Sequence, residues 1–162
     1  MINRSLQKLQ SLLLEIKSNI TNKNIEDTNI SKATVGWHLD HSLKVFNVVC
    51  EVLAGSNPNE YKSKFNTTRW LIFTLGSFPR GKVKAPKKVV SENISISDKD
   101  LHEQLEHAKT ALSIIKTLDP HAYFKHHIFG NLSKKQTMRF LEIHTNHHLK
   151  IVQEILRSHR LK

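Results

Sequence analysis

Histidines are the residues of this chain most able to do chemistry, since eleven of the 162 residues are histidine. Two of them, His144 and His148, stand four residues apart in the segment H-T-N-H-H-L. Side chains at this spacing lie on one face of a helix, one turn apart. Paired imidazoles on one helical face are a recurrent way to hold a divalent metal ion. The spacing therefore indicates a metal site, provided that a third ligand faces the pair.

The third candidate ligand is His41, in the segment W-H-L-D-H. With each helical residue turning by about 100°, His41 falls in the middle of an apolar stripe. That stripe is formed by Trp37, Val45, Val48, Val49 and Val52. By the same rule His144 and His148 lie on either side of the centre of a second stripe. The second stripe is formed by Phe140, Leu141, Ile151, Val152 and Ile155. Cys50 falls on the far face of its helix, which argues against a role as a ligand.

Three imidazoles directed into one interior need partners, because a buried neutral imidazole has two ring nitrogens to satisfy. A divalent ion would satisfy one nitrogen of each ring and leave the other for a neighbouring group. Three protein ligands also leave positions open for water or substrate, which is the catalytic arrangement. Zn²⁺ or Ni²⁺ suits imidazole ligands, and Fe²⁺ or Mn²⁺ stays an alternative. The competing interpretation is that these are core histidines bonded to Ser, Thr or backbone.

Further residues are candidates for supporting roles around this site. Three histidines are candidates for hydrogen bonding to the ligands or for proton transfer: His38, His126 and His147. Trp37 is expected to pack in the core or, as a substrate-binding candidate, to form a pocket wall. Asp40 and Glu142 are neighbours of ligand candidates in sequence, but their helical angles direct them toward the surface. No nucleophile or general base is evident, so a metal-bound water is the expected reagent.

The elements that must position these residues are helices, because apolar residues recur at helical spacing in five stretches. Approximate bounds follow from capping and stop signals: Ile2–Ile20, Thr34–Ala54, Asn57–Gly76, Ser97–Asp119 and Ser133–Ser158. The segments 21–31 and 78–96 are predicted to be loops, and no strand is evident. This pattern predicts an all-α helical bundle in a single domain, residues 1–162.

Composition narrows the function classes. The hydrophobic fraction of 38% suits a packed domain, and the single cysteine excludes a disulfide framework. No apolar run approaches the roughly 18 residues of a membrane span, and the N-terminal residues lack the apolar core of a signal peptide. We therefore expect a cytoplasmic protein.

Charge is concentrated in one part of the chain, whose formal net charge is +11. Between Tyr61 and Ser91 there are eight cationic residues and no acidic one. This segment is either a solvated basic surface or a site for an anionic ligand. In the second interpretation the substrate-binding candidates are Arg80, Lys82 and Lys84.

Several motifs in this chain resemble the DinB-like superfamily, in a branch described as a domain of unknown function. They are V-G-W-H-L-D-H-S-L (35–43), F-P-R-G-K-V-K-A-P (78–86), H-H-I-F-G-N-L-S (126–133) and H-T-N-H-H-L-K (144–150). The resemblance implies a four-helix bundle with an additional short helix or long loop. It also implies a metal site formed by His41, His144 and His148. His127 stands where Pro would be expected, so the resemblance assigns it no role.

Two functions from different classes follow from these features. The first is a divalent-metal-dependent enzyme, either a hydrolase or a thiol or group transferase, since the resemblance includes thiol-dependent transferases and isomerases. Its expected partner is a small substrate that is anionic or carries a thiol, and a homodimer is left open. Nucleic acid and membranes are not expected partners of this enzyme. The alternative is a non-enzymatic basic helical module that binds nucleic acid or another polyanion.

Overall fold

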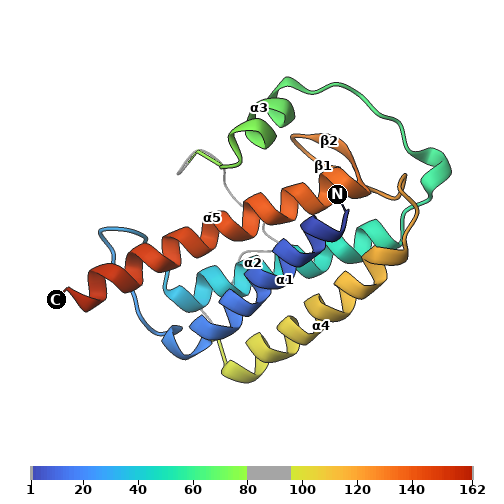
Figure 1. The fold of residues 1–162 in the computed structure, drawn as a ribbon. Helices are drawn as coiled ribbons and strands as arrows, with labels where there is room; N and C mark the ends of the chain where they lie inside the picture. Colours follow the sequence, from blue (N-terminus) through green and yellow to red (C-terminus); the bar gives the residue numbers. More distant parts are fainter. Residues whose placement is uncertain (1, 80–95, 162) are drawn as a thin grey trace.

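The protein is mainly α-helical in the computed structural model, which describes residues 2–79 and 96–161. Four long helices pack against one another around a common core (Figure 1). They are α1 (Ile2–Asn19), α2 (Val35–Ala54), α4 (Asp98–Thr117) and α5 (Lys134–Arg160). The shorter elements are η1 (Ile20–Asn22), η2 (Pro58–Glu60), α3 (Thr67–Leu75), β1 (Tyr123–His126) and β2 (Gly130–Ser133).

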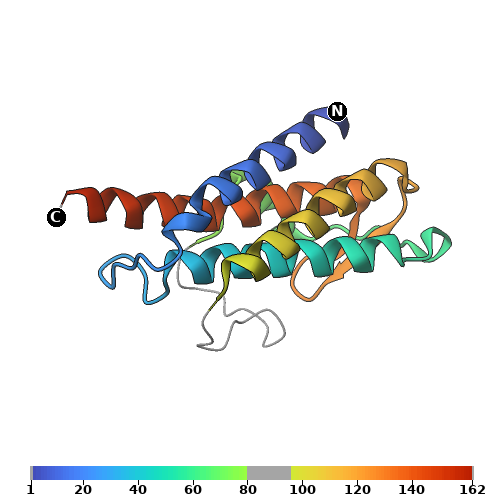
Figure 2. The ribbon, with the colours of Figure 1, turned by 90° about the horizontal axis from the view of Figure 1, so that it is seen from below.

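The directions of the long helices explain the long connection between α2 and α4. Figures 1 and 2 show α1 and α5 running one way and α2 and α4 running the other. Because α2 and α4 are parallel, the chain must return along the bundle before α4 can begin. The elements η2 and α3 lie on this return, and α3 packs against α5 outside the four long helices (Figure 1).

The helix starts follow the capping signals of the sequence. The Ser97 hydroxyl accepts a hydrogen bond from the backbone N–H of Asp100, at 3.0 Å, and α4 begins at the next residue after Ser97, Asp98. Ser133 and Gln136 form a reciprocal capping box at the start of α5. Thr34 caps α2 by accepting from the N–H of Trp37. The caps at Thr34 and Ser133 set the register of α2 and α5, the helices that carry His41, His144 and His148.

The predicted helix over Asn57–Gly76 is wrong for residues 61–66. Pro58–Glu60 is a single 3₁₀ turn, and a new helix begins at Thr67. Asn66 has an extended backbone, and its side chain accepts a hydrogen bond from the N–H of Arg69 at 2.8 Å. An N-cap of this kind starts a helix rather than continuing one. Of the apolar residues at helical spacing, Ile72 and Leu75 lie in α3, whereas Tyr61 and Phe65 lie in the non-helical segment before it.

A β-hairpin, which the sequence pattern did not predict, precedes α5. Strands β1 and β2 are antiparallel, and Tyr123 pairs with Ser133 at the open end. The Arg69 guanidinium is buried and donates to the carbonyls of Phe129 and Asn131 at the turn. These bonds attach the hairpin to α3 and so fix both over the first half of α5.

The structure does not describe most of one predicted loop, and it bears on one further expectation, the absence of a membrane span. The predicted loop 78–96 lies mostly outside the described residues, as do Arg80, Lys82 and Lys84. Across the described segments, no helix combines the length and the apolar character that crossing a membrane requires.

Candidate metal centre

Helices α2 and α5 bring together the three histidines that spacing had singled out. One nitrogen from each of His41, His144 and His148 lies within 4.8 Å of the other two. The ring centroids are 4.7 Å apart for His41 and His148 and 4.8 Å apart for His144 and His148. His41 and His148 are buried and His144 is partly buried. The cluster could therefore hold a metal ion inside the helical core.

One atom of the cluster lacks a hydrogen-bond partner that its burial demands. His144 Nδ1 is buried, and no group in the described segments bonds to it. A buried polar atom without a partner costs about 1–3 kcal/mol. A divalent ion bound by the cluster would give this ring a partner, and an all-imidazole donor set suits Zn²⁺ and other late divalent metals. The residues present fit such an ion.

Burial and neighbouring rings keep two rings of the cluster, His144 and His148, neutral. Burial lowers the pKa of His144 well below its usual value, and the neighbouring His41, His147 and His126 lower it further. Burial, followed by the charges of His144 and His41, also lowers the pKa of His148. A metal ligand must offer an unprotonated nitrogen, so both rings are in the binding form at neutral pH.

His38 lies behind His148 and orients it. Nδ1 of His38 and Nδ1 of His148 are 3.0 Å apart, a distance at which one donates a proton and the other accepts. Nε2 of His38 is in turn 3.0 Å from the Ser31 hydroxyl. Since His148 uses Nδ1 in this chain of hydrogen bonds, its Nε2 is the nitrogen left for a metal. Partners of this kind hold a ligand ring in one orientation.

Trp37 supports the third ring of the cluster. Its indole stacks on His41 with ring centroids 5.0 Å apart and an interplanar angle of 8°. The same indole meets His38 edge-on, at 5.2 Å and 87°. Trp37 is therefore a wall that holds two histidines of α2 in place.

The other two candidate histidines have different positions. His126 lies in the hairpin, where its Nδ1 accepts from the backbone N–H groups of Ile128 and Phe129. Burial, with a smaller effect from His127, lowers its pKa to about 4. His147 packs edge-on against His148, with centroids 5.2 Å apart, and lines a cavity. Neither belongs to the three-histidine cluster.

An aromatic wall formed by Phe78, Phe124, Phe129 and Phe140 lies beside the cluster. Phe140 and Phe78 reach His144, with ring centroids 5.7 Å and 6.3 Å away. Phe129 stacks with Phe78 and with the ring of His126. The wall is not evident from the sequence, because its members come from three separate segments: the residues after α3, the hairpin and α5. It makes the surroundings of His144 apolar.

The predicted surface positions of Asp40 and Glu142 are wrong, because their side chains are only 3% and 5% exposed. Asp40 accepts a hydrogen bond from Gln104 at 2.8 Å and pairs with Lys44 at 2.7 Å. Glu142 pairs with Arg139 at 3.0 Å and more distantly with Lys8. Each carboxylate is therefore neutralised by the chain itself.

The single apolar stripe expected on α2 is also displaced. Val48 and Val52 are 44% and 45% exposed, whereas Cys50 is buried at 2%. Helix α2 packs against both α4 and α5, so its buried side is wider than one stripe and is turned toward Cys50. Burial raises the pKa of the Cys50 thiol to about 12, which keeps it unreactive at neutral pH.

No family model, curated protein or solved structure matches the chain.

Proposed function

We propose that the chain is a cytoplasmic metal-dependent enzyme with a DinB-like four-helix bundle, and that His41, His144 and His148 hold a divalent ion. The proposed reaction is hydrolysis or the transfer of a thiol or another group on a small substrate. The observation that carries the proposal is the convergence of three imidazoles, two buried and one partly buried, and the partly buried ring of His144 has a buried nitrogen with no partner among the described residues. Among the described residues, buried side-chain oxygens of Asn47, Gln104 and Thr145 also lack a partner, but only the His144 nitrogen belongs to a group of converging ligand side chains.

The proposed ion is Zn²⁺ or Ni²⁺, with Fe²⁺ or Mn²⁺ as alternatives. When bound, it supplies a Lewis acid that activates water or a thiol near neutral pH. The chain's own residues orient and shield the site. The Ser31–His38 chain holds His148, and Trp37 holds His41. The aromatic wall excludes water on the side of His144, which strengthens electrostatic interactions there.

The first test is the metal content of protein purified without a histidine tag. We expect elemental analysis to find about one divalent ion per chain, since the cluster offers one set of three ligands. His41→Ala, His144→Ala and His148→Ala should each lose the ion. His102→Ala and His159→Ala are matched controls and should keep it, because both lie outside the cluster. Equal loss from ligand and control variants would mean adventitious binding and would contradict the proposal.

A screen of hydrolase and thiol-transfer substrates on metal-loaded protein then tests the reaction class. Activity should follow metal content across the ligand variants, with circular dichroism confirming that each variant is folded. Activity that persists in metal-free His148→Ala would rule out a metal-dependent reaction at this site.

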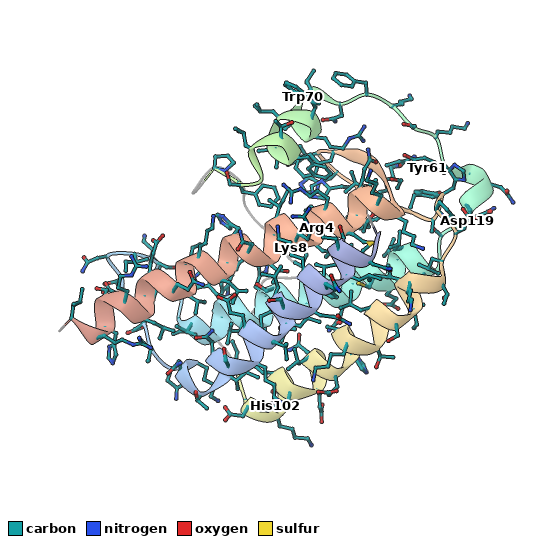
Figure 3. All side chains as sticks on the ribbon, viewed as in Figure 1. Arg4, Lys8, Tyr61, Trp70, His102 and Asp119 are labelled. Carbon is teal, nitrogen blue, oxygen red and sulfur yellow. The ribbon has the colours of Figure 1, made fainter. Side chains whose placement is uncertain are left out.

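A basic module that binds nucleic acid is the second candidate, favoured by one group of exposed residues. Phe65 and Trp70 are 77% and 60% exposed, and the cations Lys62 and Lys64 lie just before them in the chain. Figure 3 shows Trp70 at the outer edge of α3. Exposed aromatic rings beside cations can stack with the bases of a single strand. Fluorescence anisotropy with labelled oligonucleotides at low salt tests this candidate, and absence of binding to single strands and duplexes would remove it.

A further inference from the structure

A cavity of about 120 Å³ lies between the end of α3 and the middle of α5. Ser77 and Phe78 line it from the segment after α3, and Asn146, His147 and Lys150 line it from α5. Figure 1 shows how the end of α3 comes to lie over α5. The cavity is next to the three-histidine cluster, because His147 contacts His148 and Phe78 contacts His144.

The volume sets what this cavity can accept. Pockets that enclose whole drug-sized ligands measure about 300–1,000 Å³. A cavity of about 120 Å³ takes one end group of a small molecule. The rest of such a molecule must extend beyond it.

The chemistry of the lining selects an anion. The side chains of Lys150, Asn146 and Ser77 form no hydrogen bond or ion pair with any other described residue. Lys150 and Ser77 are exposed and Asn146 is partly buried, so an ammonium, a hydroxyl and an amide that no other described residue engages line one small, solvent-accessible space. The described lining includes no acidic residue. Unused donors around a cation suit a carboxylate or phosphate oxygen.

One feature opposes an anion, and the structure offsets it. The C-terminal end of a helix carries partial negative charge, and the cavity lies just after the end of α3. Arg139 places its guanidinium at that end and donates to the carbonyl of Phe73 at 3.2 Å. The Gly76 N–H also bonds back to the Ile72 carbonyl. The exposed negative end is therefore largely capped.

We propose that this cavity binds the anionic end group of the substrate, a carboxylate or a phosphate, beside the three-histidine cluster. Lys150, Asn146 and Ser77 hold the oxygens of the end group. Phe78 and the buried Ile143 provide an apolar side for the adjoining carbon atoms. The assignment of the ligand as substrate depends on the proposed enzymatic function, whereas anion binding at the cavity does not.

The test uses the full-length protein stripped of metal and then freed of chelator, since a chelator is itself a polyanion. Amide resonances are followed by NMR while inorganic phosphate or acetate is added at constant ionic strength, balanced with chloride. We expect saturable shifts at Ser77, Asn146 and Lys150. Lys150→Met should weaken binding about tenfold or more, as expected for the loss of a charge-assisted hydrogen bond. Lys125→Met, at an exposed cation in β1, is the matched control and should leave binding unchanged.

The two anions distinguish the source of the end group. Tighter binding of phosphate would assign a phosphorylated ligand, and tighter binding of acetate a carboxylate. Shifts that do not saturate, or that are the same in wild type and in Lys150→Met, would overturn the proposal. Ser77→Ala provides a second variant if Lys150→Met fails to fold, and should also weaken binding.

Failure here and failure of the proposed function are separable, because anion binding is measured without metal. One bound metal ion per chain together with no saturable anion binding would contradict the cavity proposal alone. Saturable anion binding, together with no divalent ion in the protein as purified, would support the cavity as an anion site and contradict the metalloenzyme. Once a substrate is known, Lys150→Met should raise KM more than it lowers kcat.

Discussion

Helices α2 and α5 each place a carboxylate and a histidine of the cluster within a few residues of each other, and the two kinds of side chain differ in how far the chain provides them with partners. The carboxylates Asp40 and Glu142 are matched by cations and an amide from the same chain. In the histidine cluster, His144 and His148 have lowered pKa values, and a buried nitrogen of His144 has no partner among the described residues. Pairing like that of the two carboxylates is typical of buried charged groups with a structural role. The histidine cluster therefore has unused ligand capacity that the carboxylates lack.

Acidification of the metal-free protein should give the largest effect and separates the two kinds of group. Because the folded-state pKa values of His144 and His148 lie below the ordinary 6.5, the folded state binds fewer protons than the unfolded state. The stability that these neutral rings contribute is present above about pH 6.5 and is lost as the pH falls. The two rings together should lower the free energy of unfolding by about 4 kcal/mol between pH 7.5 and pH 5.

Urea denaturation at several pH values measures this loss. His126, with its pKa near 4, acts in the same direction from a more exposed position. Replacing one cluster ring by Leu should remove about 2 kcal/mol of this loss, half of the share that the two rings contribute, whereas His102→Gln should leave the loss unchanged. A slope that survives in both His144→Leu and His148→Leu would show that these rings are not the source.

Removing one of the paired carboxylates should have the next largest effect. Glu142→Ala leaves Arg139 without its ion pair inside α5 and should destabilise the protein by about 2 kcal/mol. This is less than the 3–5 kcal/mol of a fully buried pair, because Arg139 is 36% exposed. Denaturation at pH 7 measures it, and metal content should stay at one ion per chain. Lys99→Met, which breaks an exposed pair with Glu103, is the control and should change stability by less than about 0.5 kcal/mol.

The smallest effect concerns the orientation of a ligand. His38→Ala should weaken metal affinity about 10–100-fold without removing the site, because His148 would lose the hydrogen bond that holds its ring. Ser31→Ala acts one bond further away and should weaken affinity less. Calorimetric titration gives the affinities, and the visible spectrum of the Co²⁺-loaded protein reports ligand geometry. An unchanged spectrum and affinity in His38→Ala would contradict a positioning role.

Helix registers could be predicted because their signals are local. Ser133 with Gln136 marks the start of α5, and the apolar spacing that follows places His144 and His148 on one face. The same local reasoning places His41 on α2. The convergence of the three on one another then follows from the packing of α2 on α5.

What the sequence could not show depends on neighbours from distant segments. The burial of Asp40 requires Gln104 from α4, and a helical wheel for α2 alone contains no such information. The strands of the hairpin have four residues each, too few for a period of two to stand out. The aromatic wall joins Phe78 to Phe129 and Phe140 across more than 50 residues of chain.

The stacking of Trp37 on His41 also makes the centre observable by optical means. The chain has two tryptophans, and the other, Trp70, is exposed on α3. In a Trp70→Phe variant, the emission would come from the indole in face-to-face contact with a candidate ligand. A paramagnetic ion such as Co²⁺ or Ni²⁺ entering the cluster would quench that emission. Occupancy of the site could then be followed in real time, in unlabelled protein and at submicromolar concentration.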